Sequence, residues 1–404
     1  MKKIFSLSVL VVSLLLQALP TDACTSAIFT GKATPDGRPL LWKHRDTGEL
    51  NNRIEFFPSG NGRKYGFIGL VNSPVQDGEV WTGTNEVGFS IMNTASYNLQ
   101  NVEAGFEDQE GAIMYKALGS CKTLKDFEKL LDRLSKPLGV EANFGVIDAE
   151  GGAAYYEVNN TTWTKIDVND PKIAPEGFLV YTNHSYTGRK DEGMGYVRYN
   201  TANEILHKAW IRGEDFTPEW IFNNLSRSYY NSLLGVDLGR NPELAPEGWF
   251  IDQDFIPRRS TSASIVVKGV KKGENPDLTV MWTILGYPPC GIAVPLFAAM
   301  GEEQPAYMLK QQDSDNCLMC DVVLARRAKV FPLSRGNGRN YMNVRLARQM
   351  MTETAYFTER DIFMQIEGNV MDKSYKEGRL DKDTLREAYK WMIYIPFFNT
   401  DEVL

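Results

Sequence analysis

The residue with the clearest chemical potential is Cys24, because it follows a stretch with the features of a cleavable leader. Two lysines precede an apolar run at 4–16, and Ala23 supplies a small side chain directly before the cysteine. A basic start, a short apolar centre and a small residue at the end are typical of a secretory signal peptide. We therefore expect residues 1–23 to be removed, so that Cys24 becomes the first residue of the mature chain.

A cysteine at the start of a mature chain can supply a nucleophile and a base together. Its α-amine titrates near ~7.7–8.0 and can accept the thiol proton, which activates the sulfur for attack on a carbonyl carbon. The alternative is a bacterial lipoprotein, in which Cys24 is lipidated and the protein is a surface-anchored binding protein. A lipobox has an aliphatic residue three positions before the cysteine and a small one two before it, whereas Thr21 and Asp22 stand here. These residues favour the nucleophile.

The sequence after this cysteine predicts a β-hairpin that brings charged side chains back to it. Two segments of β-forming residues, 24–30 and 40–46, flank a Pro-Asp-Gly turn. We expect Lys43 to lower the thiol pKa and Asp46 to hold or orient the amine. Arg45 is an alternative cation, which faces the opposite side of the sheet from Asp46.

This opening segment resembles the N-terminal nucleophile hydrolases, and in particular the cysteine-type hydrolases of linear amides. The matching features are Cys-Thr-Ser, a Gly-Lys…Asp-Gly turn and a strand that ends in Asp46, with Lys43 in the place of the family's arginine. The group includes choloylglycine hydrolases, penicillin V acylases, acyl-CoA:aminopenicillanate acyltransferases, acid ceramidases and a branch of dipeptidases. The resemblance implies a four-layer αββα sandwich and amide hydrolysis through a thioester.

Further matches follow in the family's order. The segment 83–93 resembles the family's Asn-Glu-x-Gly-strand-Asn, which implies that Asn93 binds the oxyanion. The segment 179–184 resembles its Thr-Asn-(Ser/His), so that Asn183 inherits a role in stabilising the tetrahedral intermediate. Arg198 lies roughly where the family keeps an arginine near the nucleophile, although a lone arginine in a helix is more often part of a surface ion pair.

These motifs predict a small-molecule amide as substrate and do not select one kind of amide. Bile-salt conjugates, N-acyl amino acids, penicillins and dipeptides all fit, and transfer of the acyl group to an amine instead of water is an alternative. Aromatic residues mostly pack in protein cores. Four of them follow the motifs closely enough to be predicted to line the substrate pocket: Phe56, Phe57, Trp81 and Tyr97.

Composition excludes several other classes of protein. The chain of 404 residues has 44 basic and 51 acidic side chains, a net charge of −7, which does not suit a nucleic-acid partner. No later stretch approaches the ~20 apolar residues of a membrane span. The three histidines form no metal-binding pair, so we expect no metal and no organic cofactor. The predicted location is periplasmic or secreted, in a bacterium.

Hydrophobic periodicity predicts an α+β architecture without an internal linker. We expect an N-terminal nucleophile hydrolase core over 24–300 and a helical extension over 301–404 that packs on the same domain. Helices are predicted at 111–120, 124–135, 203–211, 218–226, 322–330, 343–354, 359–368 and 382–394, and strands at 262–268 and 278–286.

Four cysteines are left after the nucleophile: Cys121, Cys290, Cys317 and Cys320. An even number in an exported protein allows one or two disulfides. The Cys-Leu-Met-Cys pair could also be half of a metal motif, but its second half is missing. We therefore favour disulfides or buried thiols over a metal site.

Overall fold

The N-terminal hairpin forms as the sequence predicts. The computed structural model describes residues 23–74, 77–99, 108–337 and 339–394, so the expected signal peptide lies outside the described residues except for Ala23. Strand β1 (Ala23–Phe29) pairs antiparallel with β2 (Leu40–Asp46), and this register sets Cys24 opposite Arg45. The connecting turn contains Gly37 at a φ of 74°, which a glycine adopts without steric cost.

This hairpin lies inside a six-stranded sheet. The strand order is β10-β1-β2-β14-β15-β16, and every neighbouring pair is antiparallel. The other four strands are β10 (Phe178–Tyr181), β14 (Thr261–Lys268), β15 (Val280–Leu285) and β16 (Val294–Leu296). Both predicted strands in the 262–286 region are therefore confirmed, and β14 lies directly beside the second strand of the hairpin.

The second sheet has seven strands in sequence order. It is an antiparallel meander formed by β3 (Asn52–Phe57), β4 (Phe67–Asn72), β5 (Thr82–Asn85), β6 (Ser90–Ala95), β7 (Ala142–Ile147), β8 (Ala153–Val158) and β9 (Trp163–Asp167). Two-stranded ribbons pair β11 (Tyr230–Asn231) with β12 (Val236–Asp237), and β13 (Trp249–Ile251) with β17 (Tyr341–Asn343).

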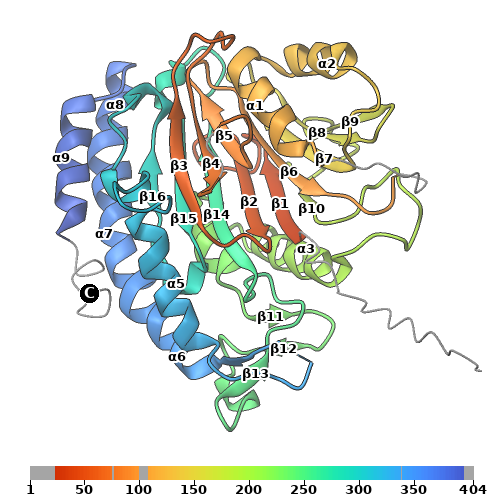
Figure 1. Cartoon of the computed structure of the whole chain (residues 1–404), viewed down its shortest axis with the longest axis vertical. Coiled ribbons are helices and arrows are strands. Elements are labelled where there is room, and N and C mark those ends of the chain that lie inside the picture. Colours follow the sequence, from red (N-terminus) through yellow and green to blue (C-terminus); the bar gives the residue numbers. More distant parts are fainter. Residues whose placement is uncertain (1–22, 75–76, 100–107, 338, 395–404) are drawn as a thin grey trace, which may run out of the picture.

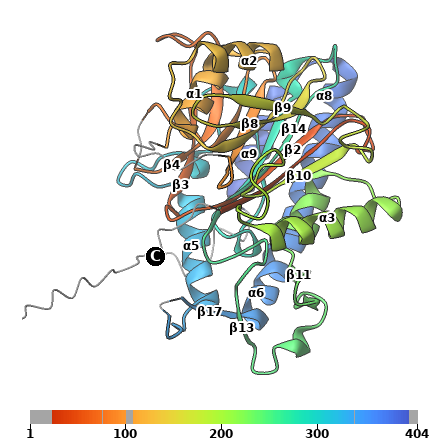
Figure 2. The same ribbon diagram turned by 90° about the vertical axis from the view of Figure 1, so that its right-hand side faces the viewer.

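The two large sheets pack face to face, and helices cover both outer faces (Figures 1 and 2). Helix α1 (Glu110–Ser120) packs on β5 and β6, and α2 (Leu124–Arg133) packs beside α1. Helix α3 (Tyr196–Ile211) contacts β10, and α4 (Pro218–Ile221) contacts β14 before it continues as the π-helical segment η1 (Phe222–Ser226). The predicted four-layer αββα sandwich is thus confirmed.

The C-terminal region is helical, as predicted. It contains α5 (Leu318–Val330), α6 (Val344–Met350), η7 (Met351–Glu359), α7 (Arg360–Phe363), η8 (Met364–Met371), α8 (Asp372–Glu377) and α9 (Lys382–Ile393). Short 3₁₀ segments lie at Pro242–Leu244, Pro276–Leu278, Pro288–Cys290, Ala298–Met300 and Ala306–Met308. Residues 395–404 of the predicted extension lie outside the described residues, and the division at residue 300 stays a prediction.

A buried ion pair fastens these helices to the sandwich. Arg227, just after η1, donates two hydrogen bonds to Glu359 at the end of η7, at 2.7 and 2.8 Å. The side chains are 0% and 1% exposed.

Within the described residues no helix has the length and apolar character of a membrane span.

Candidate active site

Cys24 lies at the start of β1 with its side chain between the two sheets. Strand neighbours alternate faces, so Cys24, Ser26 and their partners on β2 point inward, while Thr25 points outward. The hydrogen bond between Ser26 Oγ and the hydroxyl of Tyr155 on β8, at 3.1 Å, crosses the space between the sheets and confirms which face is inner. Cys24 is 4% exposed, so its side chain is almost fully enclosed.

Asn183 and Arg198 fix the backbone of the cysteine. The Cys24 backbone N–H donates to Asn183 Oδ1 at 3.0 Å, and the Cys24 carbonyl accepts from Arg198 Nη1 at 2.5 Å. Arg198 also donates to Thr25 Oγ1 and to Asn183 Oδ1, each at 2.7 Å. The Asn183 carbonyl oxygen therefore faces the cysteine nitrogen, and its amide nitrogen donates to the Ala95 carbonyl at 2.9 Å.

Arg198 is a buried part of the site and not a surface residue. It lies in the first turn of α3, which begins after Gly195 at a φ of 78°; a Cβ at Gly195 would come within 2.6 Å of Arg198 Nη2. Burial lowers the pKa of Arg198 to about 10, with a further contribution from the charge of Arg258. The guanidinium remains protonated at neutral pH and can hold the backbone oxygen of Cys24 as a cation.

Lys43 and Asn93 form a second polar unit across the sheets. Lys43 Nζ donates to Asn93 Oδ1 and, at 2.5 Å, to the Trp81 carbonyl oxygen. Asn93 Nδ2 in turn donates to Glu110, the first residue of α1. Because an amide nitrogen carries two hydrogens, this arrangement orients Asn93 and leaves it the capacity to donate to an oxyanion. Lys43 thus contacts Asn93, the residue predicted to bind the oxyanion.

Arg45 shares the inner face with the thiol. It is the direct cross-strand partner of Cys24, and its guanidinium carbon lies 4.7 Å from the centroid of the Trp81 ring. It donates to Asn52 Oδ1 at 2.6 Å and approaches Ser262 Oγ at 3.5 Å. The cation directly opposite the cysteine is therefore Arg45, whereas Lys43 is opposite Ser26.

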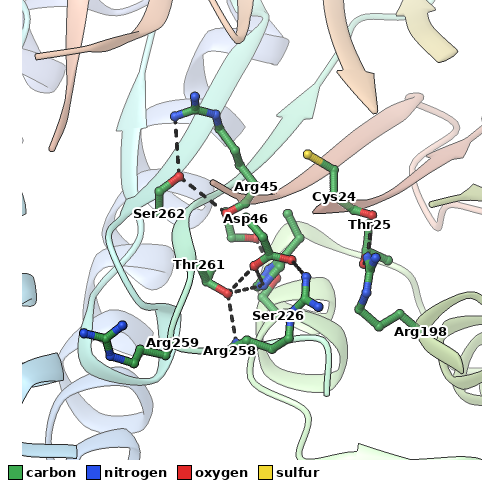
Figure 3. Close-up of polar contacts among 12 residues, drawn as sticks. Cys24, Thr25, Arg45, Asp46, Arg198, Ser226, Arg258, Arg259, Thr261 and Ser262 are labelled. Carbon is green, nitrogen blue, oxygen red and sulfur yellow. Dashed lines mark hydrogen bonds and ion pairs between the residues drawn. The ribbon is translucent and has the colours of Figure 1, made fainter. Parts of the chain in front are cut away.

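Asp46 lies on the outer face, away from the sulfur (Figure 3). It pairs with Ala23 in register, accepts from Thr261 Oγ1 at 2.5 Å and forms an ion pair with Arg258. Burial by itself lowers the pKa of Arg258, but the charge and hydrogen bond of Asp46 outweigh it and raise the pKa overall. Asp46 is thus positioned beside the backbone at the Ala23–Cys24 bond and not beside the thiol.

His44 gives the stability of this face a pH dependence. Burial lowers the pKa of His44 to about 4, and the positive charge of Arg258 lowers it further against the opposing effect of Asp46. An unfolded histidine titrates near ~6.5, so between these values the unfolded chain binds a proton that the folded chain does not. We therefore expect the free energy of unfolding to decrease by about 3 kcal/mol as pH falls from 6.5 to 4.

Urea unfolding at pH 7, 5.5 and 4.5 tests this effect with a matched pair of histidine variants. His44→Gln should lose most of this contribution to the pH dependence, whereas the variant of the exposed His207, His207→Gln, should keep it. An equal pH dependence in the two variants would contradict the assignment.

The structure brings only part of the predicted pocket to the cysteine. Trp81 contacts Arg45 with its ring and accepts a hydrogen bond from Lys43, and these two residues lie on the same face as Cys24. Tyr97 follows β6 two residues after Ala95, whose carbonyl accepts a hydrogen bond from Asn183. Phe57 instead stacks on Phe67 and packs against α1, on the outer face of the seven-stranded sheet. Phe56 lies four residues along β3 from Asn52, about 13 Å in a strand, near Gly301. Phe56 and Phe57 are thus not placed at the cysteine.

The remaining cysteines are thiols. None of the four joins a disulfide, and all are buried. Burial raises the pKa of Cys121 and of Cys290 to about 12, so these thiols stay protonated at neutral pH. The Cys317 and Cys320 sulfurs lie at 3.4 Å from backbone carbonyls of Asn52 and Leu50. Within the described residues, no cluster of three His, Cys, Asp or Glu side chains has the arrangement of a metal site.

Three contacting residues were not predicted from the sequence: Glu110, Arg258 and Thr261. Each had a local signal, because Glu110 directly precedes a predicted helix and the other two lie just before a predicted strand. Their partners are 17 to 215 positions away in the sequence, which no periodicity reveals.

Comparison with known proteins gives partial similarity. No protein-family model and no curated protein sequence matches the chain. An N-acylethanolamine-hydrolyzing acid amidase ortholog of Caenorhabditis elegans is 15% identical with a TM-score of 0.40, over 61% of this chain and 92% of that one. A conjugated bile acid hydrolase of Clostridium perfringens is 12% identical with a TM-score of 0.41, over 70% of this chain and 93% of that one.

Penicillin V acylase of Agrobacterium tumefaciens is also 12% identical, with a TM-score of 0.41, over 72% of this chain and 93% of that one. The bile acid hydrolase and the penicillin acylase are of the kinds that the N-terminal motif resembles. At these identities and TM-scores none of the three defines an activity for this chain.

Proposed function

We propose that this chain is an exported hydrolase of linear amides that uses the thiol of Cys24 as its nucleophile and the α-amine of the same residue as its base. The observation that supports it most directly is the way Cys24 is held. Its backbone nitrogen lies 3.0 Å from Asn183 Oδ1 and its carbonyl oxygen accepts from Arg198, so the backbone that carries both the nitrogen and the thiol is fixed on two sides. A nucleophile and base in fixed proximity are what covalent catalysis requires.

The proposal requires cleavage between Ala23 and Cys24. In the folded chain this bond lies at the first pair of the β1–β2 ladder, where Ala23 is opposite Asp46. Removal of Ala23 leaves Asp46 across from the new terminus, with Asn183 as acceptor for the amine. Signal-peptide removal and self-cleavage both produce this state.

The proposed reaction then proceeds in two steps, formation of a thioester and its hydrolysis. The α-amine takes the thiol proton, the sulfur attacks the amide carbonyl, and Asn93 Nδ2 donates to the oxyanion; one such donor contributes ~3–4 kcal/mol of barrier lowering. The C–N bond breaks, and the ammonium returns its proton to the leaving amine. Water, deprotonated by the same amine, hydrolyses the thioester and restores the thiol.

Blocking the α-amine while keeping the thiol is the sharpest test of this assignment. A mature chain that starts at Cys24 should hydrolyse a small amide, whereas a chain with one glycine added before Cys24 should lose about 10²–10⁴-fold in kcat, the usual contribution of a general base. Mass spectrometry confirms the two termini, and circular dichroism confirms the fold.

A matched control has one glycine added after residue 404, at the other end of the given sequence. Full activity in the glycine-extended chain would exclude the α-amine as base, and a lipidated Cys24 in protein exported from a bacterial host would exclude the whole mechanism.

A further inference from the structure

Two side chains that donate hydrogen bonds, Arg45 and Trp81, lie side by side near Cys24. The Arg45 side chain is opposite Cys24 and stacks on Trp81. The Cys24 backbone N–H is directed at Asn183 and not at Arg45, which identifies the Cys24–Arg45 pair as the non-hydrogen-bonded type. In such pairs the two Cβ atoms are about 4.5–5.5 Å apart, so the Arg45 and Cys24 side chains leave the sheet next to each other.

The indole nitrogen of Trp81 adds a second donor with no acceptor. Trp81 is 8% exposed, and its Nε1 atom is buried without a hydrogen-bond partner among the described residues. Buried polar groups without a partner are rare in folded proteins, because desolvation of the N–H is not compensated. An unpaired buried donor next to Arg45, the cross-strand partner of Cys24, is accounted for if a substrate group supplies the acceptor.

We infer that this site selects amides that carry a carboxylate, bound by Arg45 and Trp81 Nε1. This inference rests on the proposed function. A guanidinium has five N–H donors in a planar fork that matches the two oxygens of a carboxylate, so Arg45 can bind one while it keeps Asn52 as a partner. Lys43, on the same face, adds a second positive charge. The pair Arg45–Trp81 is thus a specificity determinant and takes no part in proton transfer.

The carboxylate can belong to either half of the amide. On the leaving amine it makes the substrate an N-acyl amino acid, and on the acyl group it makes the substrate a monoamide of a dicarboxylic acid. Both place a negative charge a few bonds from the carbonyl carbon. Two substrate pairs distinguish them: phenylacetylglycine with its carboxamide, and glutaryl anilide with its carboxamide.

The test is the ratio of kcat/KM for the carboxylate to that for the carboxamide. We expect wild type to prefer the carboxylate in one pair, and Arg45→Met to reduce this ratio about 10- to 100-fold, mainly through KM, because charge-assisted hydrogen bonds are lost. Arg45→Lys keeps the charge without the planar fork, so its ratio should lie between those of wild type and Arg45→Met. Trp81→Phe keeps an aromatic ring for stacking, removes the N–H and should lower the same ratio.

The control is Arg189→Met, which removes an exposed arginine paired with Glu192. If Arg45→Met does not fold, Arg45→Lys and Trp81→Phe still report the ratio. A wild-type ratio near one in both pairs, or a ratio that the Arg45 and Trp81 variants leave unchanged, overturns this inference while amide hydrolysis stands. Lack of cleavage of all four amides by wild type overturns the proposed function itself.

Discussion

Cys24→Ala should abolish amide hydrolysis, with a loss of about 10⁵-fold or more in kcat, because the variant has neither a thiolate nor a route to the thioester. The site is otherwise intact in this variant. Asn183 and Arg198 form hydrogen bonds with the backbone of residue 24, so the loss of the sulfur atom leaves these two contacts in place. The measurement is single-turnover and steady-state hydrolysis of a small amide by the mature chain.

The matched control is Cys121→Ala. Cys121 is another buried thiol, on the far side of the seven-stranded sheet at the end of α1, and its loss should leave hydrolysis within a few-fold of wild type. Cys24→Ser separates the sulfur from the geometry, since a hydroxyl is a weaker nucleophile of similar shape. Wild-type rates in Cys24→Ala would assign the chemistry to another residue.

Glu359→Gln should destabilise the protein by about 3–5 kcal/mol, because it leaves the buried Arg227 charge without its partner. Arg227 donates twice to Glu359, and the Ala293 backbone N–H donates to the same carboxylate at 2.6 Å. The pair spans 132 positions and joins η1 to η7, so its loss weakens the attachment of the C-terminal helices. Glutamine keeps the size of the side chain and removes the charge. Urea-induced unfolding gives the free-energy difference.

The control for this prediction is a solvent-exposed arginine–glutamate ion pair of the same protein. Arg189 and Glu192 are 37% and 54% exposed, and Glu192→Gln should change the free energy of unfolding by less than about 1 kcal/mol. Equal effects of the two glutamine substitutions would show that burial does not set the strength of the Arg227–Glu359 pair.

The sequence by itself determined the local elements of this protein. The hairpin of 24–30 and 40–46 forms with only small changes at its ends, because period, turn residues and β-propensity all agree over those residues. Thr123 caps α2 through a reciprocal bond with Asp126, which is also a local effect. Cys24 could be predicted as the nucleophile for the same reason, since the pattern that indicates it lies within the few residues that flank it.

Boundaries were less well determined where helices depart from the α geometry. The predicted helix 343–354 is α6 followed by the π-helical η7, which continues to Glu359. Hydrophobic spacing near 3.6 residues does not separate an α-helix from a wider helical turn, so the register of such a segment is set by its packing partners.

Only the tertiary structure decided which charged residues face the thiol. A strand sends alternate side chains to opposite faces, and the register places Arg45 opposite Cys24, whereas Asp46 is opposite Ala23 at the bond that precedes the cysteine. On that outer face Asp46 contacts Arg258 and Thr261, more than 200 positions away. Sequence spacing determines which residues of a strand share a face, whereas the pairing and packing of the sheets determine which residues that face contacts.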